Sequence, residues 1–465
     1  MPSVRALQRE LHASPVTIQR SVARLVAAGL LVTKPGDGTF VADSPTRQLV
    51  GEERQSLLDT SWQAAVLGRA PSVPTGIDHL GSLATGGEVV LDNGFPDLTL
   101  QPHELLARSG AAAARRPQSW DRCLPEGMAK LRRLVAAELG PSFALSDVLI
   151  TPGAQAALDS IFRTFVRAGD PILVEEPGYP GAIGAAILAG LVPTPVPADR
   201  DGMRTDELER ALATTGARLI VVQPRHANPS GATLSASRRA DVLNLARRFG
   251  AFVVEDDWVR DLDLEPDHPS PPPLALDDEH GHVMYVRSFS KASAPGMRIA
   301  AVAARGPAWS RLRAARLLAD FFAAPLLQET MAEVLESPTW PRHLKSLRTE
   351  LRHRRDALVQ ALQREAPELD IEVPSGGVVL WARLPGDVDE SAFVDACRGR
   401  GVRVGPGRPF WLAEPPAPFV RLSYAGAEAA SLVSAAARIG AALGEVTTTR
   451  VRSGQRHLPS PTQTG

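Results

Sequence analysis

The sequence predicts an α/β protein: a small helical segment with a β-hairpin comes first, then a domain with a mostly parallel central sheet and a smaller C-terminal α+β region. Six short, nearly continuous apolar runs alternate with stretches of helical periodicity, which is typical of parallel strands buried on both faces. Residues 1–43 instead combine two short helical patterns with a Gly-punctuated, β-like stretch. The six apolar runs are residues 148–151, 172–175, 218–223, 252–255, 283–287 and 299–304.

Composition divides the chain into four regions. After the first segment comes a stretch rich in Ser, Thr, Pro and Gly, which predicts a linker, with one apolar patch near Trp62 that favours a local helix. The long α/β domain follows, and a polar, Pro-containing end predicts a disordered tail. In chain order the predicted regions are residues 1–43, 44–88, 89–446 and 447–465.

The α/β domain is expected to have two parts. A large subdomain spans about residues 89–325 and carries the six apolar runs. A long helical stretch from 326 to 365 then leads into a smaller α+β subdomain that extends to about residue 446. The strands expected in the smaller part are residues 378–384, 402–404 and 420–424.

Charge and cysteine content limit the possible environments. The formal net charge of −1 over 465 residues argues against a surface that is basic throughout, so contact with DNA requires a local basic patch. Cys123 and Cys397 lie too far apart in sequence to suggest a disulfide framework or a metal site. We see no secretory leader and no uninterrupted run of about 18 apolar residues, so a reduced, cytoplasmic compartment is expected.

The first segment predicts a helix pair followed by a hairpin. Apolar residues recur at helical spacing over residues 4–11, and Ser14 can cap a second helix that Gly29 can end. Residues 30–33 and 39–41 then flank a Lys-Pro-Gly-Asp-Gly stretch, as the strands of a hairpin do. A helix pair with such a wing places one helix in the major groove of DNA. On spacing alone, a helical-hairpin adaptor is an equal alternative.

The motifs Pro-Ser-x-Arg-x-Leu, Gly-Leu-Leu and Gly-x-Gly-Thr-Phe-Val resemble the GntR class of winged helix-turn-helix regulators. The resemblance implies DNA binding. Members have a further helix before Pro-Ser, so the domain is expected to be truncated, with its first helix missing. Pro15 replaces an arginine of the recognition helix, which removes a base-reading side chain. The residues implied at the DNA are Arg5, Thr17, Gln19, Arg20, Gly36 and Gly38.

The strongest chemical signal is Ser-Phe-Ser-Lys-Ala-Ser-Ala-Pro-Gly-Met-Arg, which follows an apolar run directly. A phosphorylated aldehyde cofactor needs a lysine amine for condensation, and its phosphate needs hydroxyls and a guanidinium. Lys291 supplies the amine, Ser288 and Ser290 the hydroxyls, and Arg298 the guanidinium. The chain has only four lysines, so few candidates exist. Taken alone, a solvated loop lysine would be the commoner interpretation.

Two further motifs precede this one. Thr-Pro-Gly-Ala-Gln joins a strand to a helix and places Gly153, Ala154 and Gln155 at the helix N-terminus, where backbone amides bind phosphate. Many strand-to-helix turns contain glycine, so this motif is weak by itself. Glu-Glu-Pro-Gly-Tyr-Pro-Gly places Tyr179 after a strand, where its ring could stack on a pyridine or simply belong to the core.

Three more motifs complete the set. Asn228, in Pro-Arg-His-Ala-Asn-Pro-Ser-Gly, is suited to bond a phenolate oxygen, although an Asn-Pro turn is an alternative. Asp256 lies at the end of a buried strand, where a carboxylate can keep a pyridine nitrogen protonated or merely cap a helix. Arg421 could clamp a substrate carboxylate, although a lone arginine on an exposed strand is more common.

In this order the six motifs resemble fold-type-I enzymes of the aspartate aminotransferase family, over about residues 89–445, and together with the first segment they resemble the MocR subfamily of GntR regulators. The resemblance implies a homodimer with pyridoxal 5'-phosphate (PLP) on Lys291. It places Tyr179 on the ring, Asn228 at its phenolate, Asp256 at its nitrogen and Arg421 at a carboxylate of an amino compound. The implied phosphate ligands are Gly153, Ala154, Gln155, Ser288, Ser290 and Arg298.

Two departures bear on activity. Trp258 stands where the family has a tyrosine, and Arg287 stands where it has a small residue. Both predict at most weak transaminase activity. The leading hypothesis is therefore a DNA-binding transcriptional regulator that senses PLP or an amino compound. The alternative is an active aminotransferase with a vestigial DNA-binding segment.

Overall fold

The structure is a computed structural model, and the chain forms two compact units, Met1–Ala70 and Pro71–Gly465. The residues that it describes are 21–22, 31–34, 38–41, 61–67, 86–267 and 269–454.

The first unit contains the expected hairpin. Strands β1 (Leu31–Lys34) and β2 (Gly38–Val41) pair antiparallel, with Leu31 opposite Val41 and Lys34 opposite Gly38. Helix α3 (Ser61–Leu67) covers the apolar patch for which a local helix was expected. Of the residues implied at DNA, Gly38 begins β2. The others lie outside the described residues: Arg5, Thr17, Gln19, Arg20 and Gly36.

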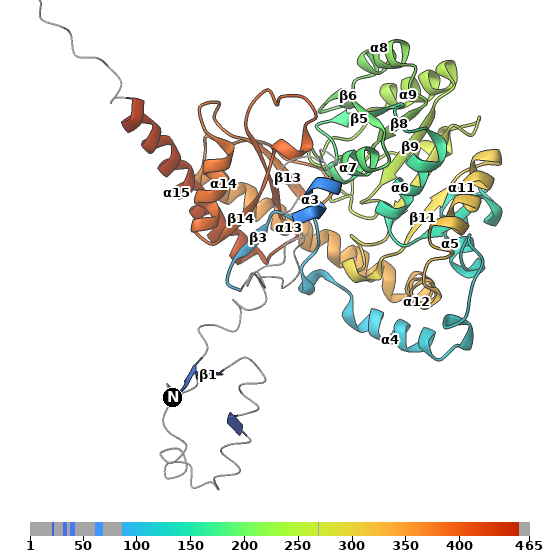
Figure 1. Cartoon of the computed structure of the whole chain (residues 1–465), viewed down its shortest axis with the longest axis horizontal. Coiled ribbons are helices and arrows are strands. Elements are labelled where there is room, and N and C mark those ends of the chain that lie inside the picture. The colour runs from blue at the N-terminus through green and yellow to red at the C-terminus, as the bar shows by residue number, and fades with distance from the viewer. Residues whose placement is uncertain are drawn as a thin grey trace, which may run out of the picture. The chain divides into compact units, whose positions relative to one another are not determined.

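The second unit is built on an eight-stranded sheet (Figure 1) with the order β4-β11-β10-β9-β8-β5-β6-β7. The five strands from β10 to β6 run parallel, whereas β11 is antiparallel to both of its neighbours and β7 is antiparallel to β6. This confirms the mostly parallel sheet. The strands are β4 (Val148–Thr151), β5 (Pro171–Glu176), β6 (Val192–Asp199), β7 (Gly202–Met203), β8 (Leu219–Val222), β9 (Phe252–Asp257), β10 (Val283–Ser288) and β11 (Ala300–Ala303).

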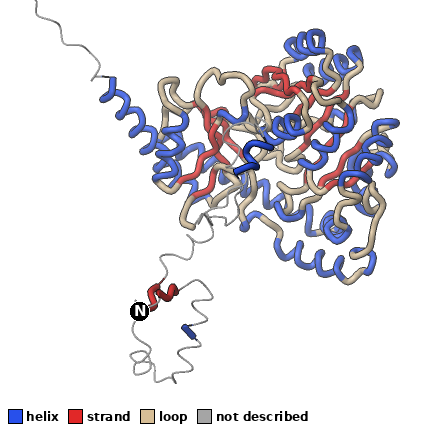
Figure 2. Tube along the Cα trace, in the orientation of Figure 1, coloured by secondary structure: helices blue, strands red, loops and turns tan. Residues whose placement is uncertain are grey.

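Helices cover both faces of this sheet, as the continuous apolar runs require. Leu149 belongs to an apolar cluster on one face, to which α6, α7 and α11 contribute, while its neighbour Ile150 belongs to the cluster on the other face, to which α5, α8, α9 and α12 contribute. Figure 2 shows the strands enclosed between helices. These helices and two others of this part are α4 (His103–Ala114), α5 (Ala129–Leu139), α6 (Ala154–Phe165), α7 (Pro180–Leu188), α8 (Thr205–Thr215), α9 (Ala236–Phe249), α10 (Leu274–Asp277), α11 (Gly306–Ala319) and α12 (Pro325–Glu336).

Strand β6 was not expected from the sequence. It contains Pro193, Pro195 and Pro197, and proline cannot donate a ladder hydrogen bond. The structure accommodates them because β6 lies next to the edge of the sheet, where only the two-residue β7 pairs with its outer side.

The smaller part is an α+β unit with a five-stranded sheet of order β12-β13-β15-β14-β3. Its strand β3 comes from the beginning of the region expected to be the large subdomain and pairs parallel with β14, so the chain enters the smaller sheet first. The long helical stretch is divided at Ser337 and Pro338 into α12 and α13. The elements are β3 (Val89–Leu91), α13 (Thr339–Glu365), β12 (Asp370–Glu372), β13 (Val379–Arg383), α14 (Glu390–Gly399), β14 (Val402–Pro406), β15 (Phe419–Ser423) and α15 (Ala429–Gly454).

Helix α15 differs from expectation in two respects. It continues to Gly454, through the first residues of the expected disordered tail. Its portion Ala429–Thr447 is also long and apolar enough to cross a membrane by length and composition, although no uninterrupted apolar run marks it in the sequence. The apolar side of the helix, which includes Leu432 and Ile439, is buried in the core of the smaller part. This packing accounts for the apolar residues on that side of the helix.

Gly440 allows α15 to approach α13 closely. A β-carbon at this position would clash with the backbone carbonyl oxygen of Glu365, at the end of α13. We therefore expect Gly440→Ala to destabilise the protein by about 1–3 kcal/mol, because the two helices must separate. Chemical denaturation followed by circular dichroism measures this change.

Gly444, one turn further along α15, is the matched control because a β-carbon there meets nothing within 4 Å. Gly444→Ala should leave stability unchanged or raise it by up to about 1 kcal/mol, the gain in helix propensity. Equal stability of the two variants would show that the helices are not in contact at Gly440.

Candidate functional site

A cavity of about 260 Å³ lies where the carboxyl ends of the parallel strands meet the smaller sheet. This edge is where open α/β sheets bind ligands. Asp256 comes from β9 and Ser288 from β10, while Arg421 comes from β15 of the smaller sheet. The lining residues are Asn93, Gly94, Phe95, Ala154, Gln155, Leu158, Tyr179, Gln223, Asn228, Asp256, Trp258, Ser288, Ser290, Lys291, Arg298 and Arg421.

Every cofactor residue expected from the sequence lines this cavity except Gly153, which lies close to the guanidinium of Arg298. The expected residues come from motifs spread over about 270 positions of the chain, from Gly153 to Arg421. Their convergence makes the cavity the candidate cofactor site.

Lys291 supplies the amine of the cavity and is half-buried. Its Nζ lies 3.6 Å from the centre of the Phe95 ring and 5.8 Å from that of Trp258. Burial, together with the positive charges of Arg421 and Arg298, lowers the pKa of Lys291 to about 7. A substantial fraction of this amine is therefore neutral at neutral pH, as a nucleophile requires.

Asp256 presents a carboxylate with one free oxygen. Its Oδ2 accepts a hydrogen bond from Gln223 Nε2 at 2.7 Å, whereas its buried Oδ1 has no partner in the described part of the chain. Burial raises the pKa of Asp256 to about 6, against the lowering effect of the Gln223 hydrogen bond. An unpartnered buried carboxylate oxygen is costly, and a cationic N–H group of a ligand in the cavity would satisfy it.

Arg421 is buried and only partly satisfied. Its two terminal nitrogens donate to Asn228 Oδ1 at 3.0 Å and to the Asp92 carbonyl oxygen at 2.7 Å, while Nε has no partner among the described residues. Burial lowers the pKa of Arg421 to about 10, so the guanidinium remains charged at neutral pH. Since Asn228 uses its oxygen on Arg421, its side-chain NH₂ group is available to a ligand in the cavity.

The opposite end of the cavity is suited to phosphate. Helix α6 begins at Ala154, so its first backbone amides are available to an anion. Ser288, Ser290 and Arg298 line the same cavity. Arg298 adopts a left-handed backbone conformation with φ of 45°, which is rare for a residue with a side chain. Gly153 leaves room for its guanidinium, because a β-carbon on Gly153 would lie 2.6 Å from an Arg298 terminal nitrogen.

Tyr179 is held in place by Gln155. The Tyr179 hydroxyl donates to Gln155 Oε1 at 3.2 Å, and Gln155 Nε2 donates to the Gly181 carbonyl oxygen at 2.7 Å. The side chain of Gln155 therefore positions the tyrosine ring, while its backbone belongs to the first turn of α6. Burial raises the pKa of Tyr179 to about 12, so the hydroxyl keeps its proton.

The charges of the cavity fit PLP. Lys291, Arg298 and Arg421 line it with positive charge, and Asp256 is the one acidic side chain among the lining residues. The excess of cations suits a phosphate and a carboxylate, the free Asp256 oxygen suits a pyridinium N–H, and the neutral fraction of Lys291 suits an aldehyde. The residues present therefore fit the cofactor.

Several lining residues were not expected from the sequence. Gln223 connects two expected residues, since it donates to Asp256 and accepts from the Asn228 backbone N–H at 2.8 Å. Asn93 and Phe95 come from the Asn-Gly-Phe segment near the start of the smaller part. A polar Gln at the end of a buried strand was the available signal for Gln223. No comparable signal marked Phe95, because only the tertiary fold brings it to Lys291.

The two residues that depart from the aminotransferase pattern differ in their position relative to the cavity. Trp258 lines the cavity, and its Nε1 donates to the His226 carbonyl oxygen at 3.0 Å, so the family's hydroxyl is absent there. Arg287 is not among the lining residues. It stacks 4.6 Å from the centre of the Phe289 ring and pairs with Glu138 at 2.9 Å. The expectation that Arg287 weakens catalysis is therefore not supported by its position.

Comparison with known proteins identifies the class of the second unit. Residues 100–439 match the family described as "Aminotransferase class I and II". The chain is 33% identical over 320 residues to a "2-aminoadipate transaminase" of Thermus thermophilus, covering 68% of this chain and 80% of that protein. The chain belongs to the aminotransferase class I and II family.

A solved structure agrees with this assignment. LysN, an α-aminoadipate aminotransferase of Thermus thermophilus complexed with N-(5'-phosphopyridoxyl)-L-leucine, superposes with a TM-score of 0.74 and 30% identity, covering 80% of this chain and 97% of that one. The family match, the bound group of this neighbour and the fit of the cavity give PLP as the cofactor.

The N-terminal segment completes the assignment. Residues 1–41 match "Bacterial regulatory proteins, gntR family". The "probable rhizopine catabolism regulatory protein MocR" of Rhizobium meliloti is 26% identical over 439 residues, covering 92% of this chain and 85% of that protein. The chain thus has the GntR–aminotransferase fusion of the MocR subfamily, which is typical of PLP-binding, DNA-binding transcriptional regulators.

Gly153 tests the arrangement of the phosphate end. Gly153→Ala should weaken PLP binding about tenfold or more, because its methyl group displaces the Arg298 guanidinium and its φ of +94° is unfavourable for alanine. Spectroscopic titration of the apoprotein with PLP measures the affinity. Gly296→Ala is the control, since a β-carbon there meets nothing within 4 Å, and it should bind like the wild type. Equal affinity of both variants would contradict the assigned phosphate end.

The pKa of Lys291 gives a pH dependence. The neutral amine reacts with the cofactor aldehyde, so attachment should be slow below the pKa of about 7, rise through it and level off above it. Borohydride reduction at short times, followed by mass spectrometry, measures attachment. A rate that keeps rising towards the ordinary lysine pKa of 10.5 would contradict the shift.

Proposed function

We propose that this chain regulates transcription by sensing PLP, or an amino compound that reaches PLP, through its aminotransferase-like domain. The observation that carries the proposal is a cavity fitted to PLP on a chain whose first residues match a DNA-binding family. A ligand controls DNA binding only if it binds one arrangement of the protein more tightly than another. We propose Arg5, Thr17, Gln19, Arg20, Gly36 and Gly38 as the residues at the DNA.

Each cavity residue has a definite task in this proposal. PLP, when bound, supplies an aldehyde that condenses with amines and a protonated ring that withdraws electrons. Lys291 would hold the cofactor, and the free Oδ1 of Asp256 would keep its ring nitrogen protonated. Tyr179 would flank the ring, and the side-chain NH₂ group of Asn228 would donate to the phenolate oxygen.

The substrate end of the cavity selects for a carboxylate. Arg421 has one unpartnered nitrogen and two bonds to neutral acceptors, Asn228 and the Asp92 carbonyl. A carboxylate is a stronger acceptor than either of them because it is charged. An amino compound with a carboxylate is therefore the effector class that the site favours.

We further propose a homodimer and a cytoplasmic location. Trp120, Leu124, Leu318 and Phe321 are exposed, with Leu318 88% accessible. The segments that carry them, residues 120–124 and 318–321, are neighbours, since the Cys123 thiol contacts the Ala323 carbonyl oxygen. An exposed apolar surface of this kind favours burial against a second copy. The cytoplasmic location is supported by the proposed partner, DNA.

A working aminotransferase is the second candidate. The lysine, aspartate and arginine that catalysis needs are all in the cavity, and Arg287 lies outside it. Trp258 provides the contrary observation, because it removes a hydroxyl from the ring's surroundings. Sustained turnover of about 1 per second or more with an amino acid and a keto acid would favour the enzyme.

Lys291 tests the sensing function. Wild-type protein should change its affinity for promoter DNA about fivefold or more on addition of PLP, the lower range of allosteric coupling. Lys291→Ala should bind the same DNA with the affinity of the apoprotein whether or not PLP is present, because the cofactor has no amine to hold it. Fluorescence anisotropy with labelled duplex measures both. If the wild type binds DNA equally with and without PLP and a carboxylated amine, the sensing function is wrong.

A further inference from the structure

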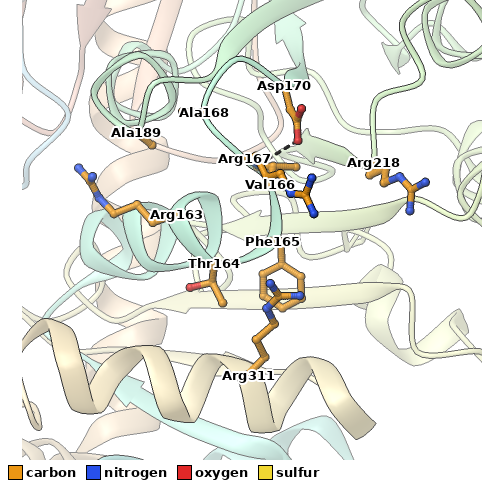
Figure 3. Close-up of a pocket in the computed structure, with 10 residues that line it drawn as sticks. All are labelled: Arg163, Thr164, Phe165, Val166, Arg167, Ala168, Asp170, Ala189, Arg218 and Arg311. Atoms are coloured by element: carbon orange, nitrogen blue, oxygen red, sulfur yellow. Dashed lines mark hydrogen bonds between the residues drawn. The ribbon is translucent and has the colours of Figure 1, made fainter.

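A second cavity, unrelated to the cofactor, is lined by four arginines (Figure 3). Its volume is about 910 Å³. It lies at the amino ends of β5 and β8, the edge of the sheet opposite to the cofactor site, because Asp170 precedes β5 and Arg218 precedes β8. We call it the arginine cavity. Its lining residues are Arg163, Thr164, Phe165, Val166, Arg167, Ala168, Asp170, Ala189, Arg218 and Arg311.

Most of this positive charge is uncompensated. Arg163 pairs with Asp159 at 2.8 Å. Arg167, Arg218 and Arg311 form no ion pair with any described carboxylate. Asp170, the acidic residue of the lining, instead accepts the backbone N–H of Arg167 at 2.9 Å, the bond drawn in Figure 3. Three unpaired guanidinium groups around one hollow repel one another unless an anion joins them.

The arginines surround an apolar centre, the ring of Phe165. Phe165 packs edge-on against Phe252, with ring centres 5.1 Å apart. The guanidinium of Arg311, which extends from α11, lies 6.0 Å from the centre of the Phe165 ring, and Figure 3 shows it directed towards that ring. The cavity therefore has a packed floor and a basic rim, and the chain as a whole carries a formal net charge of only −1.

The exposure of the arginines favours an extended anion. All four side chains belong to exposed residues, whereas a site for a small phosphate encloses its ligand among buried donors. Duplex DNA presents one negative charge per about 1.7 Å of its axis, and arginine binds phosphate through its planar fork. A chain with a GntR segment already has DNA as a partner.

We propose that the arginine cavity is a second DNA contact, which binds backbone phosphates of the duplex flanking the sequence bound by the N-terminal segment. It reads no bases. The proposal rests on the proposed DNA-binding function, and it adds to that function a contact made by the aminotransferase-like domain itself. Occupying the cavity would make the affinity for DNA depend on duplex length as well as on sequence.

The test uses the full-length chain and two duplexes. One carries only a sequence selected by the protein from a random pool, and the other extends it on each side by about two helical turns of roughly 10.5 base pairs. The triple variant Arg167→Gln, Arg218→Gln, Arg311→Gln is compared with the wild type by fluorescence anisotropy over a series of salt concentrations. Retained PLP binding shows that the variant is folded.

The wild type should bind the longer duplex more tightly and with a steeper salt dependence. The triple variant should bind the short duplex normally and lose the extra affinity for the longer one. Each lost phosphate contact lowers the slope of log affinity against log salt by about 0.9, so three contacts lower it by about 2.7.

A matched control separates location from total charge. Arg210→Gln, Arg247→Gln, Arg248→Gln removes the same charge from exposed residues of α8 and α9, which cover the other face of the sheet. This variant should behave like the wild type. An equal loss in both triple variants, or no preference of the wild type for the longer duplex, would refute the second contact.

Two other outcomes would distinguish failure of the DNA-binding function from failure of the second contact. Failure of the wild type to bind even the short, selected duplex would instead refute the DNA-binding function. If the variant binds both duplexes like the wild type, while tripolyphosphate raises the melting temperature of the wild type alone, the cavity binds a small anion and the proposal is wrong.

Discussion

The convergence of three cationic side chains on a cavity with one carboxylate is the constraint on which the cofactor site depends. Lys291, Arg298 and Arg421 are brought to the same cavity, with Asp256 as the one acidic group in its lining. Arg421 is buried, Lys291 is half-buried and Arg298 is exposed, so bringing these like charges to one cavity is costly without an anion to compensate them. The fold meets this cost in part, since Arg421 donates to two neutral oxygens and Lys291 gives up part of its charge. The remaining excess of positive charge in the cavity favours an anionic ligand.

This constraint also explains why the site needs both parts of the second unit. Asp256 lies in β9 and Lys291 follows β10 of the larger sheet, while Arg421 lies in β15 of the smaller sheet and Asp92 directly follows its β3. Gln223 ties the larger part together, because one amide orients Asp256 and accepts the backbone N–H of Asn228. Arg421 joins the two parts, because it reaches from β15 of the smaller sheet to Asn228 Oδ1 in the larger part.

The sequence predicted the parts that depend on local pattern and on motif order. The apolar runs predicted the central strands, and the hairpin around Lys34 and Gly38 was confirmed. Strand β6 was missed because its prolines oppose strand formation, and only its place near the sheet edge permits them. Gln223 and Phe95 could not be assigned from one sequence, since their roles arise from contacts with residues far along the chain. The direction of Arg287 follows from strand alternation, because Ser288 beside it faces the cavity.

Trp258 shows how the site could favour sensing over turnover. Its indole N–H is used on the His226 carbonyl oxygen, so the side chain offers the cofactor a surface but no hydroxyl. His226 itself has a φ of 44° and is fixed by Asp263, which accepts from its ring Nε2 at 2.7 Å. The indole is thus anchored to a rigid segment two residues before Asn228. With Asp256 and Asn228 in the proposed roles, such a site would hold the ring but offer it no hydroxyl from Trp258, and binding without efficient turnover is what a regulator needs from an enzyme fold.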